Sequence, residues 1–395
     1  PFRVINPYFE SSSTRIPPDM FIGRRKEMHD IIAPEGPNLL YGGRQLGKTA
    51  ILQRVQYQQN RPDDGAWAVY VDIRDKDHAE AVDTIMGELR ANGFLPPAVK
   101  ATTWDELVKA IKSRLMDAPE SRDDTLLLMM DEADNILKLF ETDNYRTLGE
   151  MKELQQTANG RFKFVFAGLH NVLRFSKMAL GGNSVLPHLG GITIQPMKFS
   201  DARELLEVPL SYLGFTIEAG QEDIIAQILH STNYFPGLIH FYAKRLVEHM
   251  QEISSPVTAP PYALSRGELL RMIGDESFRM QRRDKLMMTL RVDEKEKHAY
   301  YYTLAYALAM LNHDSEDALL HGASAAEVRD LCCSWEKNCR IGELSNQQVE
   351  ALLDELVTLN ILRKEEKNGV HFYMFSRSSF LEMLGTEEDV INNLM

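Results

Sequence analysis

Residues 38–49 read NLLYGGRQLGKT, and this stretch decides the fold. Its last eight residues, Gly42 to Thr49, match the pattern G-x-x-x-x-G-K-[ST]. An apolar run at 38–41 comes directly before the pattern, and a helical run at 50–56 follows it. A strand, a glycine-rich loop and a helix in this order let backbone N–H groups wrap around phosphates at a helix N-terminus. The stretch therefore predicts a phosphate-binding loop.

The predicted cofactor ligands are the residues of this loop and the residue that follows it, Ala50. They are Gly42, Gly43, Arg44, Gln45, Leu46, Gly47, Lys48, Thr49 and Ala50. We expect Lys48 to reach the β and γ oxygens of ATP or ADP and to act in catalysis, and Thr49 to offer its hydroxyl to Mg²⁺. The alternative, a glycine-rich turn with a surface lysine, leaves the strand and helix around the loop unexplained.

A second candidate site follows the apolar run 126–130, where Asp131 and Glu132 stand side by side. A nucleotide triphosphatase needs a carboxylate for the metal and usually one to orient water, at the end of a neighbouring strand. We expect Asp131 to hold Mg²⁺ through a water molecule and Glu132 to polarise the attacking water. The alternative is an acidic helix start that faces the helix dipole. The phosphate loop 83 residues upstream (131 − 48) favours the metal and catalytic roles.

Five short apolar runs alternate with helical stretches and predict buried strands. They are 38–41, 67–73, 125–130, 162–167 and 192–195. Strands that alternate with helices indicate an α/β fold with a parallel sheet covered on both faces. One strand-helix pair separates the two motifs in the chain. This insertion favours the additional-strand, catalytic-glutamate branch of P-loop ATPases.

The pattern changes after Pro196 and predicts further domains. The strands are expected to stop there, and Ser200 is expected to cap a helix. Near the end of the chain, Asn368-Gly369 between two apolar runs predicts a hairpin. The predicted division is a strap at 1–20, an ATPase core at 21–195, a helical lid at 196–255, a helical connector at 256–296 and a winged helix at 297–395.

Polar residues after the fourth predicted strand are candidate sensors of the γ-phosphate. His170 and Asn171 stand at this place, although a loop histidine and a helix cap explain them nearly as well. Two further turns, around Ile22 and Gly23 and around Pro236, are able to line an adenine pocket. Each turn also has an explanation that needs no nucleotide. Ile22 and Gly23 can form an ordinary hydrophobic turn, and Pro236 can be a proline at the first position of a helix.

These motifs in this order resemble the STAND branch of AAA+ ATPases, and in particular the MNS-type signalling ATPases of archaea and bacteria. The resemblance covers the chain from about residue 20. It implies that Ile22 and Gly23 flank the adenine and that Pro236 approaches it from the lid. It also implies a slow, Mg²⁺-dependent ATPase in which exchange of ADP for ATP opens a locked monomer.

The resemblance also implies a function and partners. The chain is expected to be the switch module of a larger signalling protein, active in bacterial or antiviral defence. Its expected partners are further copies of itself and fused or associated effector domains, since the chain begins at Pro1 and looks like part of a longer protein. Neither nucleic acid nor a membrane is expected as a partner.

The alternative function is a DNA-binding AAA+ ATPase of the origin-recognition or transposition-regulator type, which shares the same motifs. Charge decides against it. Residues 297–395 contain 8 Lys and Arg and 16 Asp and Glu, a net charge of 8 − 16 = −8. The expected recognition helix, 346–359, carries Glu350, Asp354 and Glu355 and no basic residue. Because DNA binding depends on cationic contacts to phosphates, this face is expected to repel a duplex.

Composition excludes several broad classes. The chain has 395 residues, a net charge of −13 and an apolar fraction of 44%, as in ordinary globular proteins. Its longest nearly apolar stretch, 299–311, is shorter than the roughly 20 residues of a membrane-spanning helix. The three cysteines, Cys332, Cys333 and Cys339, show no zinc or disulfide spacing. These features predict a cytoplasmic protein.

Overall fold

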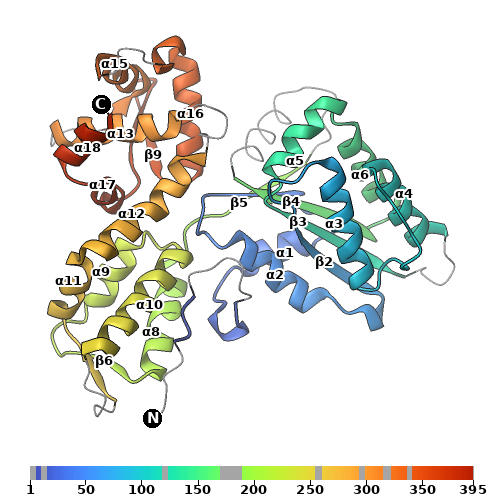
Figure 1. Ribbon diagram of the computed structural model, residues 1–395, viewed down its shortest axis with the longest axis horizontal. Coiled ribbons are helices and arrows are strands. Elements are labelled where there is room, and N and C mark those ends of the chain that lie inside the picture. Colours follow the sequence, from blue (N-terminus) through green and yellow to red (C-terminus); the bar gives the residue numbers. More distant parts are fainter. Residues whose placement is uncertain are drawn as a thin grey trace. The chain divides into compact units, whose positions relative to one another are not determined.

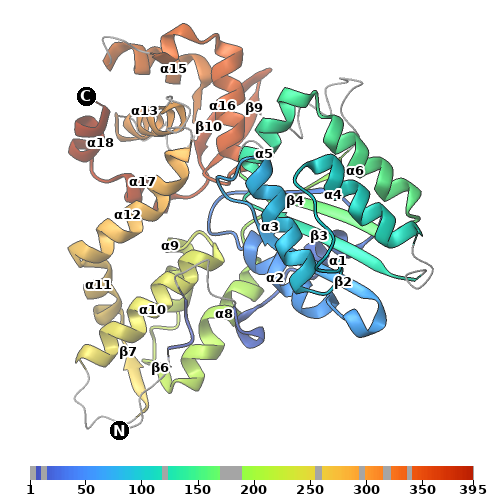
Figure 2. The same ribbon diagram turned by 45° about the vertical axis from the view of Figure 1, so that its right-hand side comes forward.

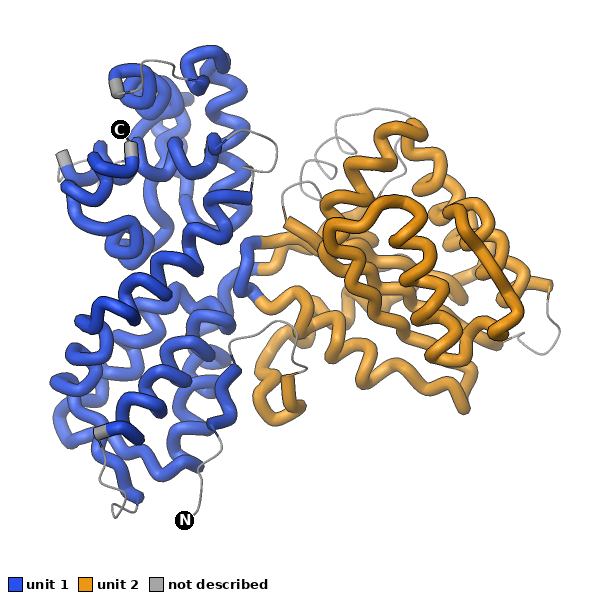
Figure 3. Tube along the Cα trace, viewed as in Figure 1, with its two compact units in different colours: residues 1–11, 43–46, 195–395 blue, residues 12–42, 47–194 orange. Residues whose placement is uncertain are grey.

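The computed structural model describes residues 6–9, 16–117, 123–169, 189–253, 260–292, 299–314, 322–335 and 340–394. The chain forms two compact units, which Figure 3 shows in two colours. The first unit, in orange, consists of residues 12–42 and 47–194. The second unit, in blue, consists of residues 1–11, 43–46 and 195–395. Four residues of the phosphate loop, 43–46, therefore belong to the second unit.

The first unit is built on a five-stranded parallel sheet (Figure 1). Its strands are β1 (Leu39–Tyr41), β2 (Ala66–Asp72), β3 (Thr125–Asp131), β4 (Phe162–Gly168) and β5 (Gly191–Thr193). The order across the sheet is β2-β3-β4-β1-β5, and every neighbouring pair is parallel. The predicted α/β fold is confirmed. The strand that lies between β1 and β3 in the sheet is β4, whereas β2, which separates the two motifs in the chain, lies at the edge.

Helices pack on this sheet, and some of them begin at residues whose side chains cap the first turn. The helices are α1 (Arg25–Ile32), α2 (Lys48–Gln59), α3 (His78–Ala91), α4 (Trp104–Lys112), α5 (Asp134–Leu139) and α6 (Arg146–Thr157), with the short turns η1 (Pro18–Met20), η2 (Pro62–Asp64), η3 (Ser113–Asp117) and η5 (Phe140–Asp143). Asp77 and Glu80 form a capping box at the start of α3. Fully buried Ile85 of α3 joins Leu128 and Phe164 of the strands in one apolar core. This core fixes the strand ends that carry the two motifs.

The second unit is mainly helical and contains two small sheets. Its first elements are α8 (Phe199–Tyr212), β6 (Phe215–Ile217), α9 (Ile224–Ser231), α10 (Pro236–Ile253), β7 (Tyr262–Leu264), α11 (Arg266–Gly274) and α12 (Glu276–Leu290). β6 and β7 pair in parallel, so the prediction that strands stop after Pro196 is wrong. The N-cap of α8 is Lys198 and not the predicted Ser200. A strand is recognised in a sequence by the alternation of apolar and polar residues, and strands of three residues are too short to show it.

The N-terminal residues 6–9 pack on these helices. The Tyr8 hydroxyl donates to the Leu206 carbonyl at 2.7 Å, and the Phe9 N–H donates to Nδ1 of His240 at 3.3 Å. His240 is 4% exposed, and its burial lowers its pKa to about 4. The imidazole therefore stays neutral and accepts the backbone hydrogen bond.

The remaining elements form a helical segment with a three-stranded antiparallel sheet, β8-β10-β9 (Figure 2). They are α13 (Tyr300–Asp314), β8 (Ala323–Ser324), α15 (Ala325–Trp335), η7 (Arg340–Glu343), α16 (Asn346–Thr358), β9 (Leu362–Lys367), β10 (Val370–Phe375), α17 (Ser378–Leu384) and α18 (Glu387–Leu394). Asn368 and Gly369 join β9 to β10 with φ angles of 54° and 77°. The predicted Asn-Gly hairpin is confirmed.

A buried arginine joins this segment to the preceding helices of the same unit. Arg282 of α12 is 6% exposed and donates to the Ser379 carbonyl at 3.1 Å and to the Glu382 carboxylate at 3.0 Å. The rings of Phe235 and Phe380 pack edge to face at 6.0 Å. The predicted division of the second unit into lid, connector and winged helix stays a prediction. In the described part of the chain, no helix is long and apolar enough to cross a membrane.

Candidate active site

The loop between β1 and α2 has the backbone that a phosphate site requires. Gly42 and Gly47 adopt φ angles of 157° and 88°, and Gln45 adopts 65°. Gly47 is the N-cap of α2 and places no side chain over the first N–H groups of that helix. The Nζ of Lys48, itself 8% exposed, donates to the Gly42 carbonyl at 2.8 Å. The loop thus joins a helix N-terminus to a buried cation, the donors that bind phosphate oxygens.

Asp131 lies at the end of β3 and faces the start of α2. The Thr49 hydroxyl donates to Oδ2 of Asp131 at 2.6 Å, and the carboxylate residue is 1% exposed. Burial raises the pKa of Asp131, against the Thr49 hydrogen bond and the charge of Lys48, which lower it. The helix that follows begins only at Asp134. Asp131 is the last residue of β3 and bonds to α2, which favours the metal role over the acidic helix start.

Glu132 is held in an unusual backbone conformation. Its φ of 56° lies in the left-handed region, and its N–H donates to Oδ1 of Asp131 at 3.0 Å. Nη2 of Arg74, which follows β2, lies 3.4 Å from Oε1 of Glu132. The Glu132 side chain is 26% exposed, so water reaches it. A strained residue at this place is typical of functional sites.

Tyr70 of β2 is a site residue that the sequence analysis missed. Its hydroxyl donates to Oδ2 of Asp131 at 3.2 Å. Burial, then the charges of Asp131 and Asp72, raise the pKa of Tyr70 above its usual range, so the hydroxyl keeps its proton and donates. The register of β2 and β3 pairs Asp72 with Asp131. The signal in the sequence that could have indicated this residue is a tyrosine two residues before the end of β2, the strand that pairs with β3.

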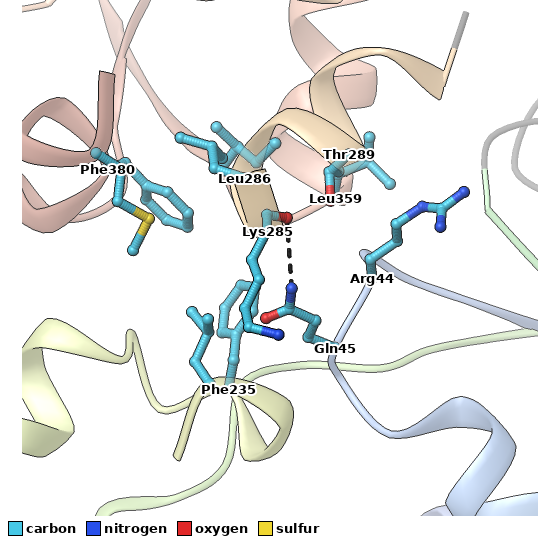
Figure 4. A pocket seen from close by; sticks show the side chains of 11 residues that line it. Arg44, Gln45, Phe235, Lys285, Leu286, Thr289, Leu359 and Phe380 are labelled. Carbon is cyan, nitrogen blue, oxygen red and sulfur yellow. Dashed lines mark hydrogen bonds between the residues drawn. The ribbon is translucent and has the colours of Figure 1, made fainter. Parts of the chain in front are cut away.

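The tip of the loop packs with helices of its own unit (Figure 4). The Gln45 side chain points at α12, where its Nε2 donates to the Lys285 carbonyl at 3.3 Å. The Gly237 N–H donates to the Gln45 carbonyl at 3.0 Å. Arg44 and Gln45 line a small hollow together with Phe235, Leu238, Lys285, Leu286, Thr289, Leu359, Ile361, Phe380 and Met383. The Gln45 side chain is thus hydrogen-bonded to α12. Its predicted binding of the cofactor would therefore use its backbone and not its side chain.

The other predicted ligands lie in three places. Ile22 and Gly23 precede α1, and Phe21 beside them lines a hollow with Ala50 of α2. Pro236 is the first residue of α10, in the other unit, and its approach to the base stays a prediction. His170 and Asn171 lie outside the described residues.

Lys48, Thr49 and Asp131, with the N-terminus of α2, have the chemistry that a magnesium-nucleotide site requires. A helix N-terminus and an ammonium group suit phosphates, and a hydroxyl with a buried carboxylate suits Mg²⁺. The residues therefore fit ATP with Mg²⁺. No group of three or more His, Cys, Asp or Glu that could hold a metal by itself occurs among the described residues.

No protein-family model and no curated protein matches the sequence. Solved structures match over nearly the whole chain. The Walker-type ATPase PABY2304 of Pyrococcus abyssi superposes with a TM-score of 0.59 at 13% identity, covering 94% of this chain and 98% of that one. The ORC2 protein of Aeropyrum pernix, in ADPNP-ADP complexes, gives 0.58 at 14% identity, covering 97% and 96%. The ORC1 protein of the same organism, in complex with DNA, gives 0.45 at 14% identity, covering 95% and 93%.

The first two likenesses show the fold. This chain has the parallel-sheet α/β fold of AAA+ P-loop ATPases, followed by helices, as predicted. The prediction of a nucleotide-binding ATPase agrees with these neighbours. The likeness shows the fold of AAA+ ATPases and does not distinguish the STAND branch.

Two predictions about function are wrong. The signalling switch gives way to the alternative, because the matched proteins include ORC2 beside a Walker-type ATPase. The exclusion of nucleic acid is also wrong, because it followed from a count of charges along the chain that ignored where the charged side chains lie.

The charge count misled because it treated every acidic residue of α16 as exposed. Glu355 is 6% exposed and accepts a hydrogen bond from the Tyr301 hydroxyl. Oδ1 of Asp354 accepts from Nζ of Lys364 at 2.8 Å and from the hydroxyl of Tyr373 at 2.9 Å. Glu350 pairs with His371. Each of the three acidic side chains therefore has a partner inside the segment, and only Glu350 and Asp354, 37% and 31% exposed, reach solvent.

Proposed function

We propose that this protein binds and hydrolyses ATP with Mg²⁺ and couples it to binding of duplex DNA, as an ATPase of the origin-recognition type. The observation that carries the first part is the meeting of Lys48 and Thr49, at the start of α2, with Asp131, at the end of β3, with a 2.6 Å hydrogen bond between Thr49 and Asp131. The narrower resemblance to the STAND branch stays a prediction.

The roles of the residues follow from their chemistry. Bound ATP with Mg²⁺ supplies a phosphoanhydride whose γ-phosphoryl group passes to water. Lys48 neutralises the β and γ oxygens, and the N–H groups at the start of α2 bind them. Thr49 and Asp131 provide the oxygens for the metal. Glu132 accepts the proton of the attacking water once its carboxylate turns away from Arg74.

Phosphate release tests this part of the proposal. The unaltered chain should release phosphate from ATP with Mg²⁺ and fall to background with EDTA. Thr49→Val keeps the size of the side chain and removes the hydroxyl, so Mg²⁺-dependent release should be lost. Thr84→Val, at a half-buried position in α3, is the matched control and should behave as the unaltered chain. Equal release by both variants would contradict the assignment of Thr49.

The DNA part rests on the β9–β10 hairpin together with the fold. The side chains of Arg363 and Lys367 are 53% and 40% exposed, and each lies within 4 Å of the Glu365 carboxylate, at 3.6 Å and 3.9 Å. Exposed ion pairs of this kind contribute roughly 0–1 kcal/mol, so a phosphate can replace the carboxylate at little cost. A two-stranded hairpin of this size is able to reach into a groove of DNA.

Fluorescence anisotropy with a labelled duplex tests the DNA part. We expect binding that weakens steeply as the salt concentration rises, because cationic contacts to phosphate release counterions. Binding that does not respond to salt, or no binding with either ADP or ATP present, would overturn this part and leave the ATPase assignment intact.

A further inference from the structure

We propose that Tyr70 is a positioning residue that orients the Asp131 carboxylate for the divalent cation of the site. The inference rests on the proposed ATPase function and adds a residue from the strand beside the acidic motif. Its basis is the hydrogen bond from the Tyr70 hydroxyl to Oδ2 of Asp131 at 3.2 Å. All residues of the argument belong to the first unit.

Three donors hold the Asp131 carboxylate. Oδ2 accepts from the Thr49 hydroxyl at 2.6 Å and from the Tyr70 hydroxyl at 3.2 Å, and Oδ1 accepts from the Glu132 N–H at 3.0 Å. Thr49 is also the predicted metal ligand. A lone pair of its hydroxyl oxygen can bind a cation while its proton still points at Asp131, so this hydrogen bond does not have to break. Among the described side chains, the second donor to Asp131 is Tyr70, so its hydroxyl keeps the carboxylate in place.

The chemical type of this donor suits the task. A tyrosine hydroxyl is neutral, so it fixes the direction of the carboxylate and leaves its negative charge for the cation. An arginine at the same place would compete with a metal, and the nearby Arg74 is instead drawn to Asp72 and Glu132, at 3.6 Å and 3.4 Å. Mg²⁺ demands near-octahedral geometry, so the direction of a ligand carboxylate affects its affinity.

The fold makes this placement rigid. Tyr70 lies in β2, and the register pairs it with Met129, two residues before Asp131. A parallel neighbour with seven paired positions, Ala66–Asp72 against Thr125–Asp131, does not slide. The phenol therefore stays beside the carboxylate whether or not a nucleotide is present.

Tyr70→Phe tests the inference, because it removes the hydroxyl and keeps the ring. The measurement is ATP binding at increasing Mg²⁺ concentration, followed by calorimetry. We expect the Mg²⁺ concentration at half-saturation to rise about tenfold, the lower end of the usual effect of residues that orient metal ligands. Affinity for ATP in EDTA and the melting temperature without nucleotide should stay unchanged. If the hydroxyl only stabilised the fold, the melting temperature would fall.

Tyr145→Phe is the matched control, since that hydroxyl also bonds a carboxylate, Glu141, away from the site. It should leave the Mg²⁺ dependence as in the unaltered chain. An unchanged Mg²⁺ dependence in Tyr70→Phe, with Mg²⁺-dependent binding intact in the unaltered chain, would overturn the inference alone. Absence of Mg²⁺-dependent binding in the unaltered chain would overturn the proposed function and the inference with it.

Discussion

Functional predictions were made for two regions, the end of the parallel sheet and the α16–β10 segment. The structure agrees with the prediction for the first region and not with that for the second. At the sheet, a motif of eight residues and two carboxylates predicted which groups meet, and the structure brings Thr49 to within 2.6 Å of Asp131. In the α16–β10 segment, a count of charges along the chain predicted a repelling face, although Glu355 is buried. A motif specifies backbone and contacts together, whereas a charge count says nothing about which charges meet solvent.

Glu132→Gln is expected to have the largest effect. The amide keeps the shape of the side chain and loses the charge that takes a proton from water, so ATP should still bind while turnover falls by about 10²-fold or more. Calorimetry measures the binding of ATP, and phosphate release from the same sample measures turnover. Glu153→Gln, exposed on α6, is the control. Normal turnover in Glu132→Gln would show that the motif marks a metal ligand only.

The next prediction concerns a charge that burial suppresses. The pKa of His240 is about 4 in the folded chain, against about 6.5 when unfolded. Below pH 6.5 the unfolded chain binds a proton that the folded chain does not, so His240 costs stability as the pH falls toward 4. At pH 5 the cost is about 2 kcal/mol, at roughly 1.4 kcal/mol per pH unit.

His240→Asn should remove this part of the pH dependence. Denaturant unfolding of the unaltered chain and of the variant, at pH 7 and pH 5, gives the difference in the free energy of unfolding. The loss on acidification should be smaller in the variant. An equal loss in both chains would mean that His240 is protonated in the folded state and that other groups cause the acid sensitivity.

A smaller effect is expected at the hairpin. Arg363→Glu combined with Lys367→Glu should weaken duplex binding and reduce the slope of log affinity against log salt by about two, one for each lost phosphate contact. Lys26→Glu combined with Lys109→Glu changes the net charge equally on the first unit. If this control pair weakens binding as much as the hairpin pair does, the long-range charge of the chain and not the hairpin attracts DNA.

The sequence could predict what depends on neighbouring residues. The five strands, the loop at 42–49 and the Asn368-Gly369 turn each have a local pattern, and all are present in the structure. The sequence could not predict Tyr70, because its contact with Asp131 depends on which strands are neighbours in the sheet. Nor could it predict the pairing of β6 with β7, whose strands are three residues long and lie far apart in the chain.

The most direct test of the nucleotide site is calorimetric titration of ATP in the presence of Mg²⁺. The account predicts saturable binding by the unaltered chain and by Lys26→Ala, an exposed lysine of α1, and at least about tenfold weaker binding by Lys48→Ala, or roughly 1.4 kcal/mol. Equal affinity of Lys48→Ala and the unaltered chain, with the fold intact by circular dichroism, would contradict the assignment of the phosphate loop.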